Sequence, residues 1–347
     1  HGAAFVLVAG DLFDSPSADK ATVSAACSAI GQIGVPVLAI PGNHDHAGPG
    51  SVWEQAFFQR ERDALAPNLR VLLEVAPVEL DAAVILPCPL LRRAVMADPT
   101  DWLRTPEAFA GLSPDKPRIV LAHGSTQTFS GQWSDDEEGA SASNLLDLSR
   151  LPATEIDYIA LGDWHGSKQI DAKAWYAGTP ELDRFPKGGE HDPGNVLVVE
   201  ARRGAAPLVA RVATSRLRWR ELTFDFAGDA SLNTLQERLF ALLESRANED
   251  LLRLSLTGSL GIEAANRLEE LLESLGARLL RMKLANGTLI APTDAELQAL
   301  TARSGDPLIA SVACKLVERA AGDSEEAQVA RIALRELHAA CTREART

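Results

Sequence analysis

Short apolar runs alternate with polar or amphipathic stretches over the first 205 residues, a pattern typical of β-strands interleaved with helices. Helices are expected over about 18–33 and 52–65. The expected strands are AAFVLVAG, VPVLAI, a run near LRVLLE, AAVILPCPLL, RIVLAHG, IDYIALG, AWYAG and NVLVVEA. Strands that are first separated by helices and then follow one another predict an α/β fold of two stacked mixed β-sheets flanked by helices.

The pattern changes after RRGAAP at 202–207. The expected strands are then LVARVAT, RWRELTFDF, LLRLSLTG and ARLLRMKLA, with helices over about 231–246 and 262–274. Two amphipathic helices follow, PLIASVACKLVERAA and EAQVARIALRELHAAC, separated by GDS. We therefore expect a large domain over 1–205, a smaller α/β domain over 206–305 and a helical tail over 306–347.

Composition and charge restrict the class of protein. The net charge of -14 is uneven, because residues 207–347 carry 18 basic and 20 acidic side chains, which leaves 16 against 28 for residues 1–206. This excess of acid opposes nonspecific binding to nucleic acid, which needs local clusters of Lys and Arg. The four cysteines form no CxxC pair, and no apolar run reaches the roughly 18 residues of a membrane helix. We expect a cytoplasmic protein that does not bind a membrane.

Acidic, amide and imidazole side chains follow four of the expected strands. They are Asp11 in VAGDLFD, Asn43, His44, Asp45 and His46 in AIPGNHDH, His123 in VLAHG, and Asp163 and His165 in ALGDWHG. Each group by itself is also typical of a polar turn. However, four of the seven histidines fall directly after apolar strands that are far apart in the sequence. Because the carboxyl ends of strands joined by crossover helices meet at one edge, we expect a single site.

The chemistry of these groups indicates a metal centre. Carboxylate and amide oxygens together with imidazole nitrogens suit Mn, Fe or Zn better than Ca or Mg. A central carboxylate can bridge two ions about 3.5 to 4 Å apart, and such a pair promotes displacement at phosphorus. The expected reaction is hydrolysis of a phosphoester.

The motifs GDLFD, GNHD, AHG and GDWHG resemble, in this order, those of the calcineurin-like metallophosphoesterases, which are DxH, GDxxD, GNHD, H and GHxH. Within that superfamily, AGDLFD, IPGNHD and YAGTPELDRF resemble the SbcD-type DNA repair exonucleases, the bacterial nuclease subunit that works with an ABC-type ATPase. The resemblance covers roughly residues 3–200. It implies a four-layer metallophosphoesterase sandwich and a DNA exonuclease that uses two divalent ions, with Mn2+ expected and Fe2+ or Zn2+ as alternatives.

The resemblance also implies roles for the metal ligands. Asp11 becomes the carboxylate that bridges both ions, Asn43 and His123 become ligands of one ion, and His165 becomes a ligand of the other. Asp163 stands where the family motif has its first histidine. Either it ligates the Asn43/His123 ion through oxygen, or it only closes a turn.

Three polar residues of the GNHDH run do not become ligands. His44 matches the family's non-ligating histidine, which stabilises the transition state and serves the leaving oxygen. Asp45 is expected to orient His44 or to hold the turn. His46 has no matching role, so it is either a substrate contact or a solvated loop residue.

No DxH motif precedes Asp11, and His1 comes before a strand instead of ending one. We expect that a segment carrying DxH is missing from this chain. Two ligands of the His165 ion would then be absent, so the chain is expected to bind one metal well at most.

The C-terminal part resembles the α/β cap and helical tail of SbcD-type proteins. The resemblance implies that the cap positions DNA, that the tail contacts the coiled-coil base of an SbcC-type ATPase, and that the protein forms a homodimer. Arg216, Arg218 and Arg220 would share one face of a strand and follow phosphates, or would be ordinary solvated arginines. The helical pair would equally pack within its own domain.

Two other functions compete with a nuclease. A phosphodiesterase or phosphatase for small molecules is favoured by the acidic surface and by Asp163. A binding subunit with a degraded site is suggested by the absent DxH motif. The stretch SGQWSDDEEGASASN at 130–144 is expected to be an exposed acidic loop.

Overall fold

The computed structural model describes residues 2–126, 143–185, 192–244, 247–290, 292–303, 305–322 and 324–344. His1 and all but the last two residues of the expected acidic loop at 130–144 lie outside the described residues. The chain divides into two compact units, the first formed by residues 1–183 with 187–215 and the second by residues 184–186 with 216–347. In the described part, no helix is both long and apolar enough to span a bilayer.

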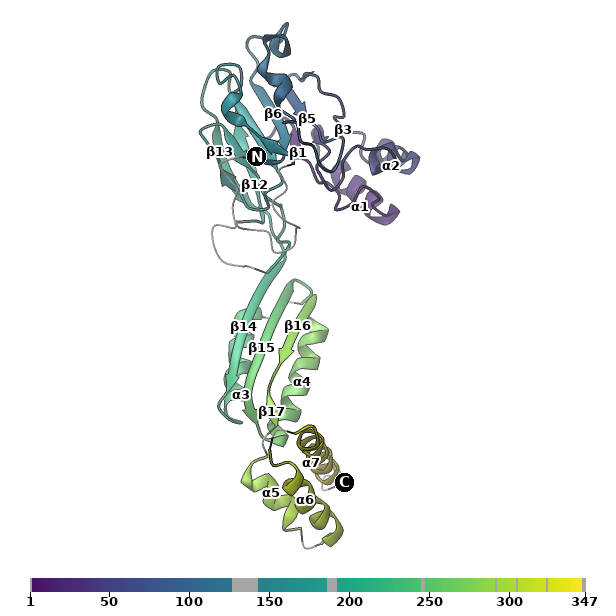
Figure 1. Ribbon diagram of the computed structural model, residues 1–347, viewed down its shortest axis with the longest axis vertical. Coiled ribbons are helices and arrows are strands. Elements are labelled where there is room, and N and C mark those ends of the chain that lie inside the picture. Colours follow the sequence, from purple (N-terminus) through teal and green to yellow (C-terminus); the bar gives the residue numbers. More distant parts are fainter. Residues whose placement is uncertain are drawn as a thin grey trace. The chain divides into compact units, whose positions relative to one another are not determined.

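A three-stranded parallel sheet forms one layer of the first unit (Figure 1). Its strands, in spatial order, are β1 (Val6–Ala9), β2 (Val37–Ile40) and β3 (Leu69–Val71). The helices that connect them, α1 (Lys20–Gly31) and α2 (Ala56–Leu65), pack on this sheet through an apolar cluster that includes Cys27, Phe58 and Val37. The sheet is parallel throughout and not mixed, because helical crossovers return each strand in the same direction.

The helix expected over 52–65 is interrupted at one residue. A 3-10 turn, Val52–Glu54, is separated from α2 by Gln55, whose backbone is extended at φ -67 and ψ 130. The Nε1 atom of Trp53 donates to the carbonyl oxygen of Asp45, which fixes this turn beside the loop that follows β2.

A six-stranded mixed sheet forms the second layer, in the order β10-β11-β9-β6-β5-β4. Its strands are β4 (Val78–Glu79), β5 (Val84–Cys88), β6 (Arg118–His123), β9 (Tyr158–Gly162), β10 (Lys168–Gln169) and β11 (Ala174–Tyr176). The four central strands are parallel, and the two outer strands are antiparallel to their neighbours. His123 pairs in register with Gly162, so β6 and β9 end at the same level.

Buried apolar side chains pack the two sheets face to face. Leu38 and Ile40 of β2 contact Ile85 of β5 and Leu121 of β6 in one cluster. The opposite face of the larger sheet is covered by a second cluster, to which Leu103 and Ala108 of the 3-10 helices Asp101–Arg104 and Pro106–Phe109 contribute. Two stacked sheets with flanking helices are the fold predicted from the sequence.

An antiparallel pair of strands, β12 (Asn195–Glu200) and β13 (Leu208–Ala213), completes the first unit. Val199 and Val209 pack against the cluster between the two sheets. The first unit therefore extends to residue 215, beyond the boundary expected at 205, because β13 pairs with β12.

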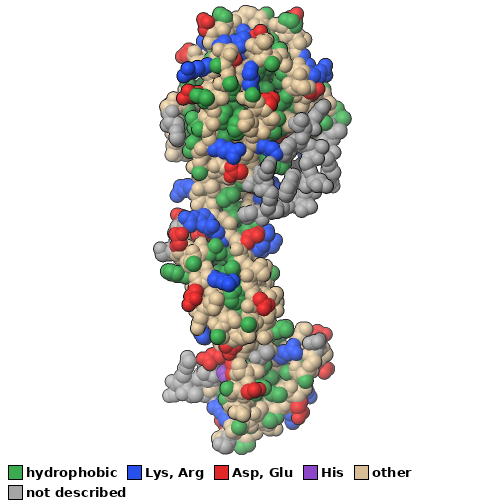
Figure 2. Space-filling view, turned by 90° about the vertical axis from the view of Figure 1, so that its left-hand side faces the viewer, with side chains coloured by type: hydrophobic (Ala, Val, Ile, Leu, Met, Phe, Trp, Pro, Cys, Tyr) green, Lys and Arg blue, Asp and Glu red, His purple; other side chains and the backbone are tan. Residues whose placement is uncertain are grey.

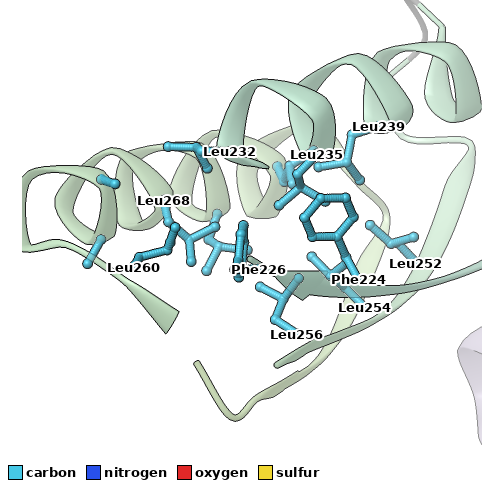
Figure 3. Close-up of a cluster of buried hydrophobic side chains, with 14 of the residues drawn as sticks. Phe224, Phe226, Leu232, Leu235, Leu239, Leu252, Leu254, Leu256, Leu260 and Leu268 are labelled. Atoms are coloured by element: carbon cyan, nitrogen blue, oxygen red, sulfur yellow. The ribbon is translucent and has the colours of Figure 1, made fainter. Parts of the chain in front are cut away.

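The second unit contains a parallel sheet of β14 (Arg218–Phe226), β15 (Asp250–Leu260) and β16 (Arg281–Asn286), with β17 (Leu289–Ile290) beside the end of β15. The helices α3 (Ser231–Leu243) and α4 (Ile262–Arg278) cover one face of it. Phe224 and Phe226 meet the leucines of both helices in this core (Figure 3).

Three more helices belong to this same unit instead of forming a separate tail. They are α5 (Asp294–Thr301), α6 (Pro307–Arg319) and α7 (Glu325–Glu344). Ile262 of α4 packs with Leu300, Ala313 and Leu334 from these helices. Thr293 and Glu296 form a capping box at the start of α5, a helix that the apolar periodicity did not indicate.

Candidate metal centre

The turn after β1 brings Asp11 to the edge of the first sheet. Gly10 has φ 90, and a Cβ atom there would overlap Nδ1 of His123 and lie 2.9 Å from Cα of Gly42. Asp11 itself is left-handed, at φ 53. Such a backbone costs on the order of 1–3 kcal/mol in a residue other than glycine, and it is typically retained where function requires it.

The loop after β2 is tied to this turn by Asp45. Its buried carboxylate accepts hydrogen bonds from the backbone N–H groups of Gly42 at 2.7 Å and of Asp11 and Phe13 at 3.2 Å each. Burial raises the pKa of Asp45 to about 6, and the nearby negative charge of Asp11 acts in the same direction. Of its two expected roles, holding the turn is the one that this geometry displays.

His123, at the end of β6, is 1% exposed and lies between the two sheets. Its Nδ1 atom is 2.7 Å from the carbonyl oxygen of Ala9, an acceptor, so Nδ1 carries a proton. Its Nε2 atom is 2.8 Å from Oδ1 of Asn43 and 3.3 Å from Oδ2 of Asp11. The ring therefore directs its second nitrogen at two oxygen acceptors.

With the amide oxygen of Asn43 turned toward Nε2, as the structure places it, these acceptors need a positive charge between them. In neutral imidazole Nε2 is itself an acceptor once Nδ1 holds the proton, so three lone pairs would face one another. Burial by itself would lower the pKa of His123, but its hydrogen bond and charge interaction with Asp11 raise that pKa above its ordinary value. Burial likewise opposes ionisation of Asp11, and His123 lowers the pKa of that carboxyl nonetheless. Either a proton or a metal ion meets this demand.

Asp163 follows β9 at the same edge. Its Oδ1 atom is 3.8 Å from Nε2 of His123, and its Oδ2 atom accepts a hydrogen bond of 2.6 Å from the Ser125 hydroxyl. Asp163 is also left-handed, at φ 101. A Cβ on Gly162 would overlap the carbonyl oxygen of Ala9, so glycine is required where the two sheets approach each other.

His165 is held by a carboxylate that the sequence did not indicate. Its Nδ1 atom is 2.5 Å from Oδ2 of Asp183, and its carbonyl oxygen accepts from the backbone N–H of Thr179 at 2.9 Å. A carboxylate on Nδ1 fixes the ring and makes Nε2 the nitrogen through which His165 would ligate a metal. Asp183 lies in YAGTPELDRF, which was noted only for its resemblance, because spacing alone does not pair it with His165.

The donor set around His123 fits one divalent ion. Ligand atoms about 2.0–2.2 Å from a shared ion lie about 3.0–3.4 Å from one another, close to the separations between Nε2 of His123 and the oxygens of Asn43 and Asp11. In the described part of the chain, His, Cys, Asp and Glu side chains by themselves form no group of three that could hold a metal. The candidate centre therefore depends on the amide oxygen of Asn43.

Both histidines of the GNHDH run, His44 and His46, lie on the loop after β2. The backbone N–H of His44 donates to Oδ1 of Asp11 at 2.9 Å, and its ring Nδ1 lies 3.2 Å from the carbonyl oxygen of Asp14. Nδ1 of His46 accepts from the N–H of Gly48 at 3.2 Å, so this ring caps its own turn. Nδ1 of His44 and Nδ1 of His46 are thus both engaged by backbone groups.

The three arginines expected to share a strand face do not do so. Only Arg218 and Arg220 lie in β14, which begins at Arg218, and Arg216 precedes it. The Arg218 guanidinium is 3.6 Å from Glu244, and that of Arg220 is 3.8 Å from Asp250. On the face that Figure 2 shows, basic and acidic side chains are interspersed over the second unit. Arg218 and Arg220 thus pair within this unit.

A comparison with protein families agrees with the motifs. Residues 1–167 match the family model described as calcineurin-like phosphoesterase. The matched range contains both stacked sheets up to β9 and each candidate ligand from Asp11 to His165. This part of the chain is therefore similar to calcineurin-like phosphoesterase domains, which supports metal-dependent hydrolysis of a phosphoester in general terms.

Proposed function

We propose that this protein is a DNA exonuclease of the SbcD type that uses divalent ions, Mn2+ in the first place. One observation carries the metal part of the proposal. Nε2 of buried His123, whose other nitrogen is committed to Ala9, faces the oxygens of Asn43 and Asp11 at 2.8 and 3.3 Å. Asp163 is the fourth ligand in this proposal, and His165 belongs to a second ion.

Ions held at these residues would activate water as the nucleophile and neutralise charge on the phosphate. His44 would hold a proton at Nε2 for the leaving oxygen, with its Nδ1 against the carbonyl oxygen of Asp14. Asp45 would act through the backbone, because it holds the Asp11 turn and the Gly42 turn at a fixed spacing. His46 would contact substrate only if it left its bond to Gly48.

DNA as the substrate rests on resemblance, with support from the second unit. AGDLFD, IPGNHD and YAGTPELDRF are the motifs that favour the SbcD type. The second unit is an α/β sheet with three further helices, as expected for a cap that positions DNA and a helical surface for an SbcC-type ATPase. The same resemblance makes a homodimer part of the proposal.

The test compares two substrates. With Mn2+ the protein should degrade linear DNA from its ends, and His44→Ala should lower kcat by about 100-fold or more while metal binding persists. A chromogenic phosphodiester serves as the small substrate. Hydrolysis of only the small ester would overturn the nuclease and leave a small-molecule phosphodiesterase. Absence of both activities in protein loaded with metal would support a binding subunit instead.

A further inference from the structure

The segment after β5 runs beside the candidate metal centre. β5 is parallel to β6, so its carboxyl end lies at the edge of the sheet that carries His123. The N–H of Leu90 donates to the carbonyl oxygen of Pro41 at 3.2 Å, and the carbonyl oxygen of Leu90 accepts from Ala47 at 3.0 Å. Leu90 thus binds both ends of the loop that carries Asn43 and His44.

Asn144 holds the other end of this segment. Its side chain accepts from the N–H of Val95 and donates to the carbonyl oxygen of Arg93, at 2.9 Å each, and its N–H donates to Val95 at 2.7 Å. Its own carbonyl oxygen accepts from the N–H of Ser125 at 3.1 Å. The backbone between Leu90 and Val95 is therefore fixed between the His44 loop and the residues that follow His123.

Two adjacent arginines, Arg92 and Arg93, lie on this fixed stretch and are exposed. Within the described residues, neither side chain has an ion pair, hydrogen bond or ring contact. Residues 1–206 contain a large excess of acid, and other arginines of this unit do find carboxylates. Examples are Arg104 with Asp98 at 2.5 Å, Arg203 with Asp157 at 3.3 Å and Arg211 with Asp192 at 3.1 Å. These two cations lie on a backbone that is bonded to the His44 loop, and no carboxylate of the described part neutralises them, so they are available to an anion that the protein does not itself supply.

We propose that Arg92 and Arg93 form a subsite for phosphates that flank the scissile phosphate of a polynucleotide. The inference rests on the proposed function, because it assumes that a phosphodiester is cleaved at the neighbouring centre. Guanidinium groups bind phosphate oxygens in a fork and stay charged at any physiological pH. A small ester has a single phosphate, and that phosphate occupies the metal centre. Only a polynucleotide, which has further phosphates, can therefore use this subsite.

The test uses the full chain with Arg92→Ala and Arg93→Ala together. DNA affinity is measured by fluorescence anisotropy in EDTA over a series of salt concentrations. Loss of two phosphate contacts should weaken binding and reduce the slope of log K against log salt by about 1.4 for single strands or 1.8 for duplex. With metal, KM for DNA should rise by about 10-fold or more, while kcat/KM for the small phosphodiester stays unchanged.

The matched control is Arg70→Ala with Arg150→Ala, which removes the same charge from exposed positions of the same unit. It should leave DNA affinity and KM close to those of the wild type. Lysine at both positions 92 and 93 should restore most of the salt slope, because it restores the two positive charges. If the alanine variant were weak only because its structure is disturbed, restoring charge would not restore the slope. Wild-type DNA affinity in the Arg92/Arg93 alanine variant, or an equal loss in the control, overturns the subsite. This binding result does not depend on whether DNA is cleaved, so it separates failure of the subsite from failure of the nuclease.

Discussion

Nδ1 of His165 lies 2.5 Å from Oδ2 of Asp183, a residue 18 positions further along the chain. The side chain of His165 is 42% exposed, so burial does little to hold the ring in place. The carboxylate fixes both the orientation of the ring and the proton on Nδ1. Asp183 is thus a positioning residue for the imidazole that we assign to the second ion.

Asp183→Asn should weaken binding of the second, more weakly held ion at His165 by about 10- to 100-fold, because the amide holds the ring less firmly and makes it a poorer electron donor. Titration with Co2+, followed by its absorption spectrum, measures this affinity without turnover. The control is Asp81→Asn, which changes an exposed carboxylate in the same unit. Equal Co2+ affinity in the wild type and in both variants would contradict the role of Asp183.

Gly10→Ala should destabilise the fold and disturb the metal centre together. The new methyl group would overlap Nδ1 of His123, and the backbone there has φ 90. We expect the free energy of unfolding to fall by about 2–4 kcal/mol, as measured by urea denaturation. Gly204→Ala is the control, since its φ is 73 and a Cβ there meets open space. A loss in Gly204→Ala as large as in Gly10→Ala would show that backbone conformation, and not the approach of His123, is the cause.

Asp45 should make the metal-free protein less stable as the pH rises. Its pKa is raised from 3.8 to about 6 in the folded state, so folding favours the protonated carboxyl. The resulting loss in the free energy of unfolding is absent below the unfolded pKa and grows as the pH rises from about 4 to 6. Above that pH the loss is complete, at about 3 kcal/mol. Urea denaturation in EDTA across this range measures the effect.

Asp45→Asn carries no ionisable group and is the matched variant for that experiment. Its free energy of unfolding should change less than that of the wild type between about pH 4 and pH 7, although its value is lower because the amide cannot accept from Phe13 and Gly42 together. Parallel pH curves for the two proteins would show that the pKa of Asp45 is not raised.

The apolar pattern was sufficient to predict the elements that carry the chemistry. β1, β2, β6 and β9 each lie inside a predicted strand, because a buried strand shows itself in four to six consecutive apolar residues. The polar residues after them could be named in advance, since a strand end must be followed by a turn. Elements that depend on distant partners were less well placed. β13 was assigned to the second domain because its pairing with β12 is not visible in its own residues.

The sequence by itself determined the two stacked sheets, the four strand ends and the residue types of a metal centre, because these follow from local alternation and turn chemistry. Tertiary structure decided which atoms face each other. The proton of His123 is fixed by Ala9, which is 114 positions away, and His165 is held by Asp183. The place of Arg92 and Arg93 depends on hydrogen bonds that the backbone of residues 90–95 makes with Pro41, Ala47 and Asn144. Such contacts join segments that are far apart in the chain. The direction of a ring nitrogen and the partner of a charged side chain are therefore set only when those segments pack.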